Sequence, residues 1–373
     1  MFLLIGISVL LVLGSLAEVL GLRVRDRRRF TIVITLILFI FSFIRWERGP
    51  DWLSYYNTFQ VTLPWDFTDY YGANFEFGYF LLNVLTKSIF DNYTVLLFIY
   101  ACILFYFHTA GILQFTKYPV TALLISWAMG FAGMYFVRSG IAIAILFFSI
   151  KYIQQRKFFK FIFFLILGAM FHRSVFLFII AYFIFPLKIS PRVMILSIIG
   201  AIICGFLISR MFLSLVSGAV GGIIEYKLNA YLGDEQGENY GVQLSYTSIL
   251  INGIVKRVSL VILGILMLKK MKTIDENFRG YINLIWFGTI LYFSTVMISL
   301  SLPRMAYPFD EVQILLLPCI YYFSKNKETK ILFFVLLLAF LVYRFCNNLY
   351  GTYYDLYVPY KSIFDMNLPV NVY

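Results

Sequence analysis

The sequence predicts an all-α membrane protein with about twelve transmembrane helices, and three observations support this prediction. Hydrophobic residues make up 61% of the 373 residues, whereas charged residues make up only 13%, about half of their share in a soluble domain. The mean hydropathy is +0.83. Long apolar runs alternate with short clusters of lysine and arginine. One helical membrane domain, residues 1–373, can therefore account for the whole chain.

Each apolar run can form one helix, although several runs are short for a full crossing. The first run is expected to be an uncleaved helix with its N-terminus outside, because no basic residues precede it and RVRDRRR follows it. The predicted spans are residues 1–22, 30–44, 93–115, 119–137, 140–153, 159–171, 174–187, 193–212, 247–268, 281–301, 305–323 and 331–346.

The net charge of +12 could indicate a nucleic-acid partner, but the positions of the cations indicate membrane topology instead. Most of the 31 lysines and arginines fall in or beside alternate loops of the predicted layout. By the positive-inside rule this side is the cytoplasm. Both termini are then extracytoplasmic, and no nucleic-acid partner is expected.

Three longer extracytoplasmic segments follow from this layout. Residues 45–92 contain an aromatic loop and the amphipathic stretch NFEFGYFLLNVLTKSIF, which we expect to lie in the membrane interface. Residues 217–246 are rich in glycine and acidic residues, and the tail 347–373 is rich in tyrosine. No segment is large enough for a soluble domain, so any chemistry is expected at the membrane.

Five ionisable residues fall in predicted spans or directly at their ends, where such residues are costly and usually functional. Each lies 12 to 15 residues from the nearest cytoplasmic lysine, which is about 20 Å along a helix. We therefore expect them to share one layer at the floor of a water-filled cavity open to the outside, with Lys256 and Arg304 nearby. The alternative is that they end short helices and reach water at the interface. The five are Arg138, His172, Arg173, Arg257 and Asp310.

Five sequence segments, in this order, carry a resemblance to a known family. They are IRWERGPDWLSYYNTF, NFEFGYFLLN, YFVRSGIAIAILFFSIKYIQQRKFFKF, FHRSVFLF and PRMAYPFDEVQILLLP, which fall between about residues 45 and 323. On these segments the chain resembles the Wzy-type polysaccharide polymerases, specifically the EpsG-like branch. It departs from the family pattern at Arg173, where a neutral residue is expected, and in the acidic pair of PFDE.

The resemblance implies a glycosyltransferase of the bacterial inner membrane, similar to the GT-C class, with its active site facing outward. Such an enzyme joins repeat units of a surface polysaccharide, such as an O-antigen of lipopolysaccharide. The growing chain leaves its polyprenyl diphosphate and joins the sugar end of a new lipid-linked unit. The implied partners are the lipid-linked donor and acceptor, membrane lipids and a protein that regulates chain length.

The residues fit this chemistry, because negative charge develops on the departing diphosphate and arginine matches phosphate oxygens. Arg138, Arg257 and Arg304 are the first candidates for binding the diphosphate. Lys256 and Arg173 are the second candidates. The sequence has no Asp-x-Asp motif, and its four cysteines form no CxxC pair, so we expect no metal, other cofactor or disulfide.

The acceptor hydroxyl needs a general base, and histidine can accept a proton near neutral pH. His172 is the candidate, since the other histidine, His108, lies in an apolar run and is expected to pack in the core. Asp51, Glu76 and Asp310 are alternative bases.

Sugar binding is an equally good role for several residues of the first loop and the charged layer. The aromatic residues of the loop and the tail could stack on sugars or form an interfacial belt. The loop aromatics are Trp46, Trp52, Tyr55, Tyr56 and Trp65, and the tail aromatics are Tyr350, Tyr353, Tyr354, Tyr357 and Tyr360. The predicted substrate-binding residues are Arg45, Glu76, Arg173, Lys256, Asp310, Tyr55, Tyr56 and Trp52.

Three other functions are compatible with a polytopic protein that has charges in or beside its spans. A flippase of lipid-linked glycans would often show two related halves, and the sequence shows none. A membrane glycan ligase would use the same donor. An acyltransferase would need its histidine reachable by an acyl donor, commonly from the cytoplasmic side, whereas His172 is predicted on the outer side.

Overall fold

The computed structural model describes residues 1–68, 75–216, 246–271, 275–298, 302–324, 326–350 and 354–365. Every regular element in these ranges is helical, and the one β-type pairing among them is a bridge between Arg45 and Ser362. The prediction of an all-α chain is therefore confirmed for the described residues. The predicted loop 217–246 lies almost wholly outside them, as does Tyr353.

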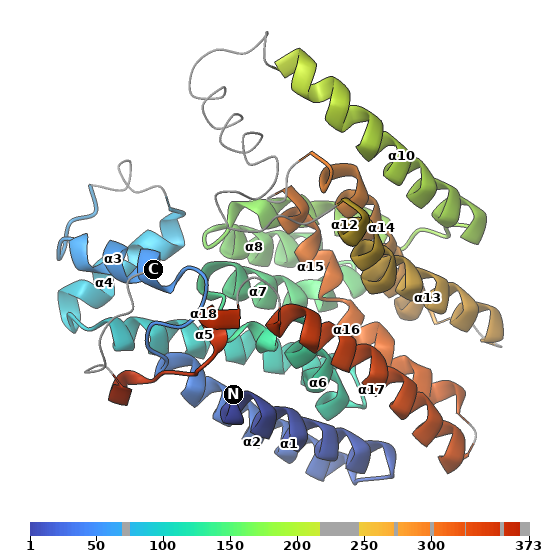
Figure 1. The fold of residues 1–373 in the computed structure, drawn as a ribbon, viewed down its shortest axis with the longest axis horizontal. Helices are drawn as coiled ribbons and strands as arrows, with labels where there is room; N and C mark the ends of the chain where they lie inside the picture. The colour runs from blue at the N-terminus through green and yellow to red at the C-terminus, as the bar shows by residue number, and fades with distance from the viewer. Residues whose placement is uncertain are drawn as a thin grey trace. The chain divides into compact units, whose positions relative to one another are not determined.

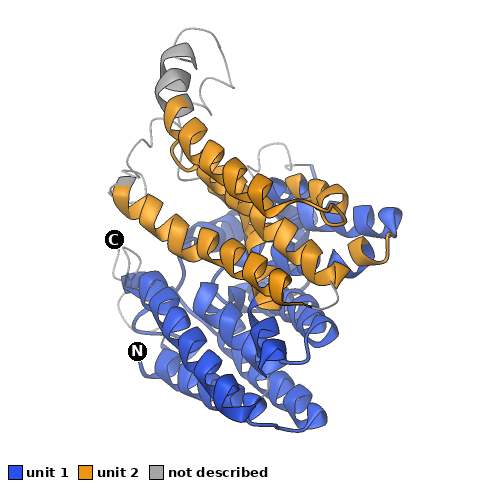
Figure 2. Cartoon of the chain, turned by 90° about the vertical axis from the view of Figure 1, so that its right-hand side faces the viewer, with its two compact units in different colours: residues 1–152, 157–176, 317–373 blue, residues 153–156, 177–316 orange. Residues whose placement is uncertain are grey.

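The chain divides into two compact units, which are described separately (Figure 2). Unit 1 comprises residues 1–152, 157–176 and 317–373, and unit 2 comprises residues 153–156 and 177–316. Their assembly into the single membrane domain expected above stays a prediction.

Unit 1 contains the helices shown in blue and cyan in Figure 1, together with others. Short 3₁₀ segments follow α6, at Phe131–Gly133, and precede α17, at Leu317–Phe323. The helices are α1 (Phe2–Val19), α2 (Val24–Phe43), α3 (Trp52–Val61), α4 (Phe77–Ile89), α5 (Tyr93–Phe115), α6 (Pro119–Gly130), α7 (Val137–Gln154, whose last two residues belong to unit 2), α8 (Phe158–Ala169), α17 (Lys327–Leu349) and α18 (Tyr354–Tyr357).

Helix α6 lies at the centre of unit 1, where it packs against α1, α2 and α17. Its N-terminus is satisfied by a buried carboxylate of α1. Glu18 accepts hydrogen bonds from the backbone N–H groups of Val120 and Thr121, at 3.2 and 2.8 Å. The first N–H groups of a helix have no partner within the helix and carry its positive dipole end, so this carboxylate caps α6.

Unit 2 is organised around α14 (Glu276–Thr295), which packs against α10 (Pro191–Val216), α13 (Ser259–Lys270) and α15 (Tyr307–Asp310). Asn283 of α14 donates hydrogen bonds to the carbonyls of Ile184, Phe185 and Leu187, at 3.1, 3.2 and 2.8 Å. These bonds satisfy the C-terminal end of a short helix. The remaining helices are α9 (Ala181–Ile184), α12 (Tyr246–Gly253), a π-helical turn (Ile254–Val258) and α16 (Gln313–Leu316), and a 3₁₀ segment (Arg173–Ile180) passes from unit 1 into unit 2.

The predicted apolar spans correspond to helical segments in the described residues, with shifts of a few residues at their ends. Two of them are broken, as expected for helices that do not run straight through a membrane. Residues 174–187 form a 3₁₀ segment and one helical turn, and residues 305–323 form several short pieces. By length and composition, five described helices can cross a membrane: Phe2–Val19, Tyr93–Phe115, Val137–Gln154, Thr247–Lys270 and Lys327–Leu349. The count of twelve spans stays a prediction.

A close approach of two helix ends in unit 1 positions the candidate site. The N–H of Gly78, in the first turn of α4, donates to the carbonyl of Met170, just after α8, at 2.8 Å. A Cβ at Gly78 would lie only 2.8 Å from that carbonyl oxygen. Only glycine therefore lets the start of α4 lie against the end of α8.

We predict that Gly78→Ala destabilises the protein by about 1–3 kcal/mol, because the added methyl group forces the two helix ends apart. The measurement is the Tm of the purified protein in detergent, which should fall by several degrees. Gly6→Ala in α1 is the matched control, since a Cβ there has nothing within 4 Å and alanine favours a helix. Equal Tm values for the two variants would contradict the close approach.

Candidate active site

The candidate site in unit 1 is a cluster centred on the carboxylate of Glu76, the residue that precedes α4. Glu76 is only 8% exposed. Its Oε2 accepts a hydrogen bond from Arg138 Nη1 at 2.7 Å, and its Oε1 accepts from the backbone N–H of Arg173 at 3.1 Å. His172 Nδ1 lies 3.4 Å from the same Oε1. The fold thus brings together the residue before α4, an arginine of α7 and the turn after α8.

The cluster keeps Glu76 ionised. Burial alone would raise the pKa of this carboxyl, but the hydrogen bond with His172, the charge of Arg138 and the N–H of Arg173 together lower it to about 2. An ionised carboxylate only accepts hydrogen bonds, so Nδ1 of His172 must carry the proton in this contact. Glu76 is consequently a weak base, although it was predicted from the sequence as an alternative general base.

Arg138 is held on its other side by aromatic residues. Its Nε donates to the hydroxyl of Tyr55 at 3.1 Å. The guanidinium carbon lies 4.6 Å from the ring centroid of Phe75, 5.2 Å from that of Tyr55 and 5.6 Å from that of Tyr79, which are cation–π distances. The Arg138 side chain remains 21% exposed. Its orientation is therefore fixed while part of it stays accessible to a ligand.

Tyr55 extends the cluster to Asp51, at the N-terminus of α3. The Tyr55 hydroxyl donates to Asp51 Oδ2 at 3.2 Å. Burial, and next the charge of Asp51, raise the pKa of Tyr55 to about 12, so the phenol stays protonated at physiological pH. Asp51 itself is exposed, which leaves its carboxylate accessible to a solute.

Unit 2 contains a second arginine–carboxylate pair, in which both side chains are buried. Arg257 lies in the π-helical turn and donates through Nε to Asp310 Oδ1 at 3.1 Å, and through Nη2 to Asp310 Oδ2. Gln313 donates to the same Oδ1 at 3.3 Å, and the Tyr292 ring lies 3.8 Å from the guanidinium carbon. Both charged residues are buried, at 8% and 7% exposure. Arg257 would have to release Asp310 before it could bind a phosphate in this bidentate way.

The comparison with protein families decides the identity of the chain at the family level. The model of the EpsG family matches residues 28–362, which is most of the chain. This protein belongs to the EpsG family. The resemblance found in the sequence is thereby confirmed, and with the apolar helices it makes the chain a membrane protein. A search of curated proteins and a search of solved structures found no match.

The other charged residues predicted from the sequence either lie outside the Glu76 cluster or contribute only a backbone group to it. Arg173 contributes its backbone N–H, whereas its side chain is exposed. In unit 2, Arg304 is exposed and Lys256 is half-buried. Among the described residues, no group of three or more His, Cys, Asp and Glu residues could hold a metal ion. The cysteines are free thiols.

The first loop of this EpsG-family protein is braced by the C-terminal segment. The N–H of Trp46 donates to the carbonyl of Lys361 at 2.9 Å, and the N–H of Ile363 donates to that of Ile44 at 2.8 Å. Lys361 Nζ also lies 3.1 Å from Glu47 Oε2. From the sequence we predicted only a tyrosine-rich tail here. Nothing in the composition of the tail indicates that its backbone pairs with the first loop.

The aromatic residues of the loop form one packed group. Trp52 stacks on Tyr56 with ring centroids 5.0 Å apart, and Trp46 lies 4.8 Å from Trp52. Trp52 is only 5% exposed, while Trp46 and Tyr56 are half-buried. Trp46 and Tyr56 thus keep ring surface for another molecule, whereas Trp52 is buried and packs against both of them.

Sequence reasoning missed two aromatic residues of the site, Phe75 and Tyr79. Both lie over Arg138 and both stand within three residues of Glu76 in the segment NFEFGYF. The alternation of aromatic residues around a lone glutamate was the available signal. Tyr79 lies three residues after Glu76, and residues three apart at a helix are neighbours on one face.

We predict that Glu76→Gln destabilises the protein by an amount that depends on pH. The pKa of Glu76 in the folded protein is about 2, below its ordinary 4.5, so the carboxylate stabilises the fold above pH 4.5 and loses this effect as the pH falls towards 2. The shift corresponds to at most about 3 kcal/mol. The Tm deficit of the variant should therefore be largest at pH 7 and smaller at pH 3.5.

Glu328→Gln, at an exposed position in α17, is the matched control and should leave Tm unchanged at both pH values. A deficit of Glu76→Gln that is the same at pH 7 and pH 3.5 would show that the ionised carboxylate does not hold the cluster.

Proposed function

We propose that this protein is a polymerase of the bacterial inner membrane that joins lipid-linked oligosaccharide units of a surface polysaccharide. It crosses the membrane about twelve times and acts on the extracytoplasmic side. The observation that carries the proposal is the Glu76 cluster, which places an arginine and a histidine on opposite sides of one carboxylate. Membership of the EpsG family supports the same function.

In this proposal His172 is the general base. Its Nδ1–H is held by ionised Glu76, which leaves the lone pair of Nε2 to accept a proton. The hydroxyl of the acceptor sugar attacks the anomeric carbon of the donor, and a new C–O bond forms. The proton of that hydroxyl passes to Nε2. A carboxylate that orients a histidine base in this way is a recurring arrangement in catalysis.

Arg138 stabilises the leaving group in the same step. As the bond between the anomeric carbon and the diphosphate oxygen breaks, negative charge develops on the polyprenyl diphosphate. Arg138 uses Nη1 for Glu76 and Nε for Tyr55, and among the described residues Nη2 has no hydrogen-bond partner. That nitrogen is the natural donor to a phosphate oxygen. The diphosphate is neutralised by guanidinium groups, so the proposed mechanism is independent of metal ions.

The sugar-binding role falls to the first loop, which Tyr55 connects to the cluster. Trp46 and Tyr56 offer ring surface, and exposed Asp51 can accept hydrogen bonds from sugar hydroxyls. A role of Arg257, Arg304 and Lys256 in diphosphate binding and of Asp310 in substrate binding stays a prediction.

We predict that Arg138→Ala abolishes long glycan chains and leaves single lipid-linked units, with a loss of turnover of about 100-fold or more. The measurement is a gel of lipid-linked glycans from cells that express the variant as their only copy. Arg25→Ala, at an exposed arginine near the start of α2, is the control. An unchanged ladder for Arg138→Ala would refute the role of this arginine.

His172→Ala should lower kcat about 100-fold, with KM within a few-fold of wild type, because proton transfer is lost while substrate binding remains. The assay is turnover of a synthetic polyprenyl-diphosphate oligosaccharide by purified enzyme. His108→Gln, in α5 outside the cluster, is the control. Wild-type kcat in the His172 variant would remove it as the base.

Purified protein should elongate glycans equally well in EDTA, since no step of the proposed mechanism uses a metal ion. The same assay separates the competing functions, because a ladder of products indicates a polymerase, and translocation of unchanged substrate indicates a flippase. Activity that is lost in EDTA and rescued by magnesium or calcium would contradict metal independence.

A further inference from the structure

The hydroxyl group of Tyr55 joins two residues to which the proposed function gives separate roles. Its oxygen accepts a hydrogen bond from Arg138 Nε at 3.1 Å, and it donates its own proton to Asp51 Oδ2 at 3.2 Å. Tyr55 was predicted to bind substrate, but it is only 5% exposed, so a sugar can reach little of it. The proposed mechanism leaves this hydroxyl without a role of its own.

Two hydrogen bonds determine how the guanidinium of Arg138 is turned. Its Nη1 donates to Glu76 Oε2 at 2.7 Å. That bond alone would leave the planar group free to turn about the line between Nη1 and Oε2. The second bond, from Nε to the Tyr55 hydroxyl, removes this freedom. Together they fix the direction in which the remaining nitrogen, Nη2, points.

The ring of Tyr55 is held by packing that does not involve its hydroxyl. Its centroid lies 5.3 Å from that of Tyr79 and 6.3 Å from that of Phe75. The guanidinium carbon of Arg138 lies 5.2 Å from the same ring. A phenylalanine at this position would keep these contacts, so the contribution of the hydroxyl can be measured alone.

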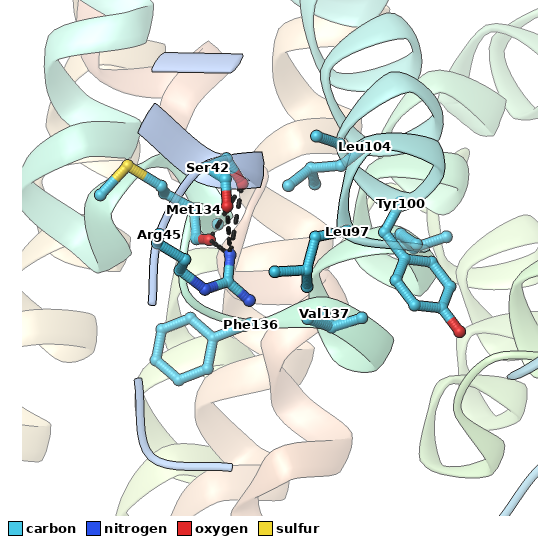
Figure 3. Close-up of a pocket in the computed structure, with 11 residues that line it drawn as sticks. Ser42, Arg45, Leu97, Tyr100, Leu104, Met134, Phe136 and Val137 are labelled. Atoms are coloured by element: carbon cyan, nitrogen blue, oxygen red, sulfur yellow. Dashed lines mark hydrogen bonds between the residues drawn. The ribbon is translucent and has the colours of Figure 1, made fainter. Parts of the chain in front are cut away.

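The backbone of Arg138 is positioned by a different residue, Arg45, which follows α2. Arg45 Nη1 donates to the carbonyl of Ser42 at 2.9 Å and to that of Met134, three residues before α7 (Figure 3). Arg45 was predicted to bind substrate, but it is only 2% exposed, and no carboxylate of the described residues forms an ion pair with it. The start of α7 is thus held without Tyr55, whose hydroxyl acts on the side chain of Arg138 alone.

We propose that Tyr55 is a positioning residue for the departure of the diphosphate, because its hydroxyl turns the guanidinium of Arg138 so that Nη2 faces the leaving group. This inference rests on the function proposed above. A phenol has one proton, and since Asp51 accepts it, the lone pairs of the oxygen are left for Arg138 Nε. Without Asp51 that proton would be free to turn towards Nε–H and oppose the contact. Asp51 therefore acts on the leaving group through Tyr55.

The first test is Tyr55→Phe, measured with purified full-length enzyme and a synthetic polyprenyl-diphosphate oligosaccharide. The kcat should fall about 10-fold, the effect of one hydrogen bond to a charged group. The KM should stay within a few-fold of wild type, because the lost contact matters most in the transition state. Tyr106→Phe in α5, at a residue that is 66% exposed, is the control and should keep the wild-type kcat. A wild-type kcat in Tyr55→Phe would overturn the proposal.

The second test asks whether Asp51 acts through Tyr55. Asp51→Ala should lower kcat by a similar factor, and the double variant should be no slower than Tyr55→Phe alone, since both changes remove the same effect. Loss of a sugar contact at Asp51 would raise KM and leave kcat unchanged, so it does not disturb this comparison. Losses of kcat that multiply in the double variant would overturn the link, and so would a wild-type kcat in Asp51→Ala.

A binding measurement separates this inference from the proposed function. Polyprenyl diphosphate, the released product, carries the charge that develops in the transition state, and it should raise the Tm of wild type in detergent. Tyr55→Phe should need about 10-fold more of it for the same rise, and Arg138→Ala should show little rise. Equal responses of wild type and Tyr55→Phe, with the response lost in Arg138→Ala, would overturn only the role of Tyr55. An Arg138→Ala variant that responds like wild type would contradict the proposed function itself.

Discussion

The carboxylate of Glu76 is the constraint on which the candidate site depends. It is buried, and its two oxygens accept from an arginine side chain, a histidine ring and a backbone N–H. The donors come from the start of α7 and from the turn after α8, and the arrangement exists only because α4 begins against the end of α8 at Gly78. One ionised group therefore fixes the position of Arg138 and the tautomer of His172 at the same time.

Three arginines of the chain show how the surroundings decide what the same side chain can do. Arg138 is paired through part of its guanidinium and remains partly exposed, so it can still donate to a ligand. Arg257 is buried and fully matched by the two oxygens of Asp310, an arrangement that favours holding segments of unit 2 together. Arg45 is buried with carbonyl acceptors and no counter-ion. Only the first combines charge with access, which is what leaving-group stabilisation requires.

Most of the longer helices could be predicted from the sequence, because apolar runs lie between basic clusters. Helix α3 was not predicted, and residues 305–323 form several short pieces where one span was expected. Most of the residue types of the site could also be anticipated, since Arg138 and His172 interrupt apolar segments. The contacts of these two residues could not be predicted, although Glu76 was named as a site residue. Glu76 is 62 and 96 residues from Arg138 and His172 in sequence, and no periodicity encodes such a contact. Arg173 participates through its backbone, which is independent of its side chain, and the pairing of the C-terminal segment with the first loop involves backbone groups in the same way.

The protonation of the His172 ring tests the central claim most directly. Protein labelled with ¹⁵N histidine and reconstituted in lipid has only two histidines to assign, and His108→Gln separates their signals. At a pH where the ring is neutral, the account predicts that His172 carries its proton on Nδ1 in wild type and shifts towards the Nε2–H tautomer in Glu76→Gln. A wild-type His172 that is protonated on Nε2, with no change in the variant, would show that Glu76 does not orient the proposed base.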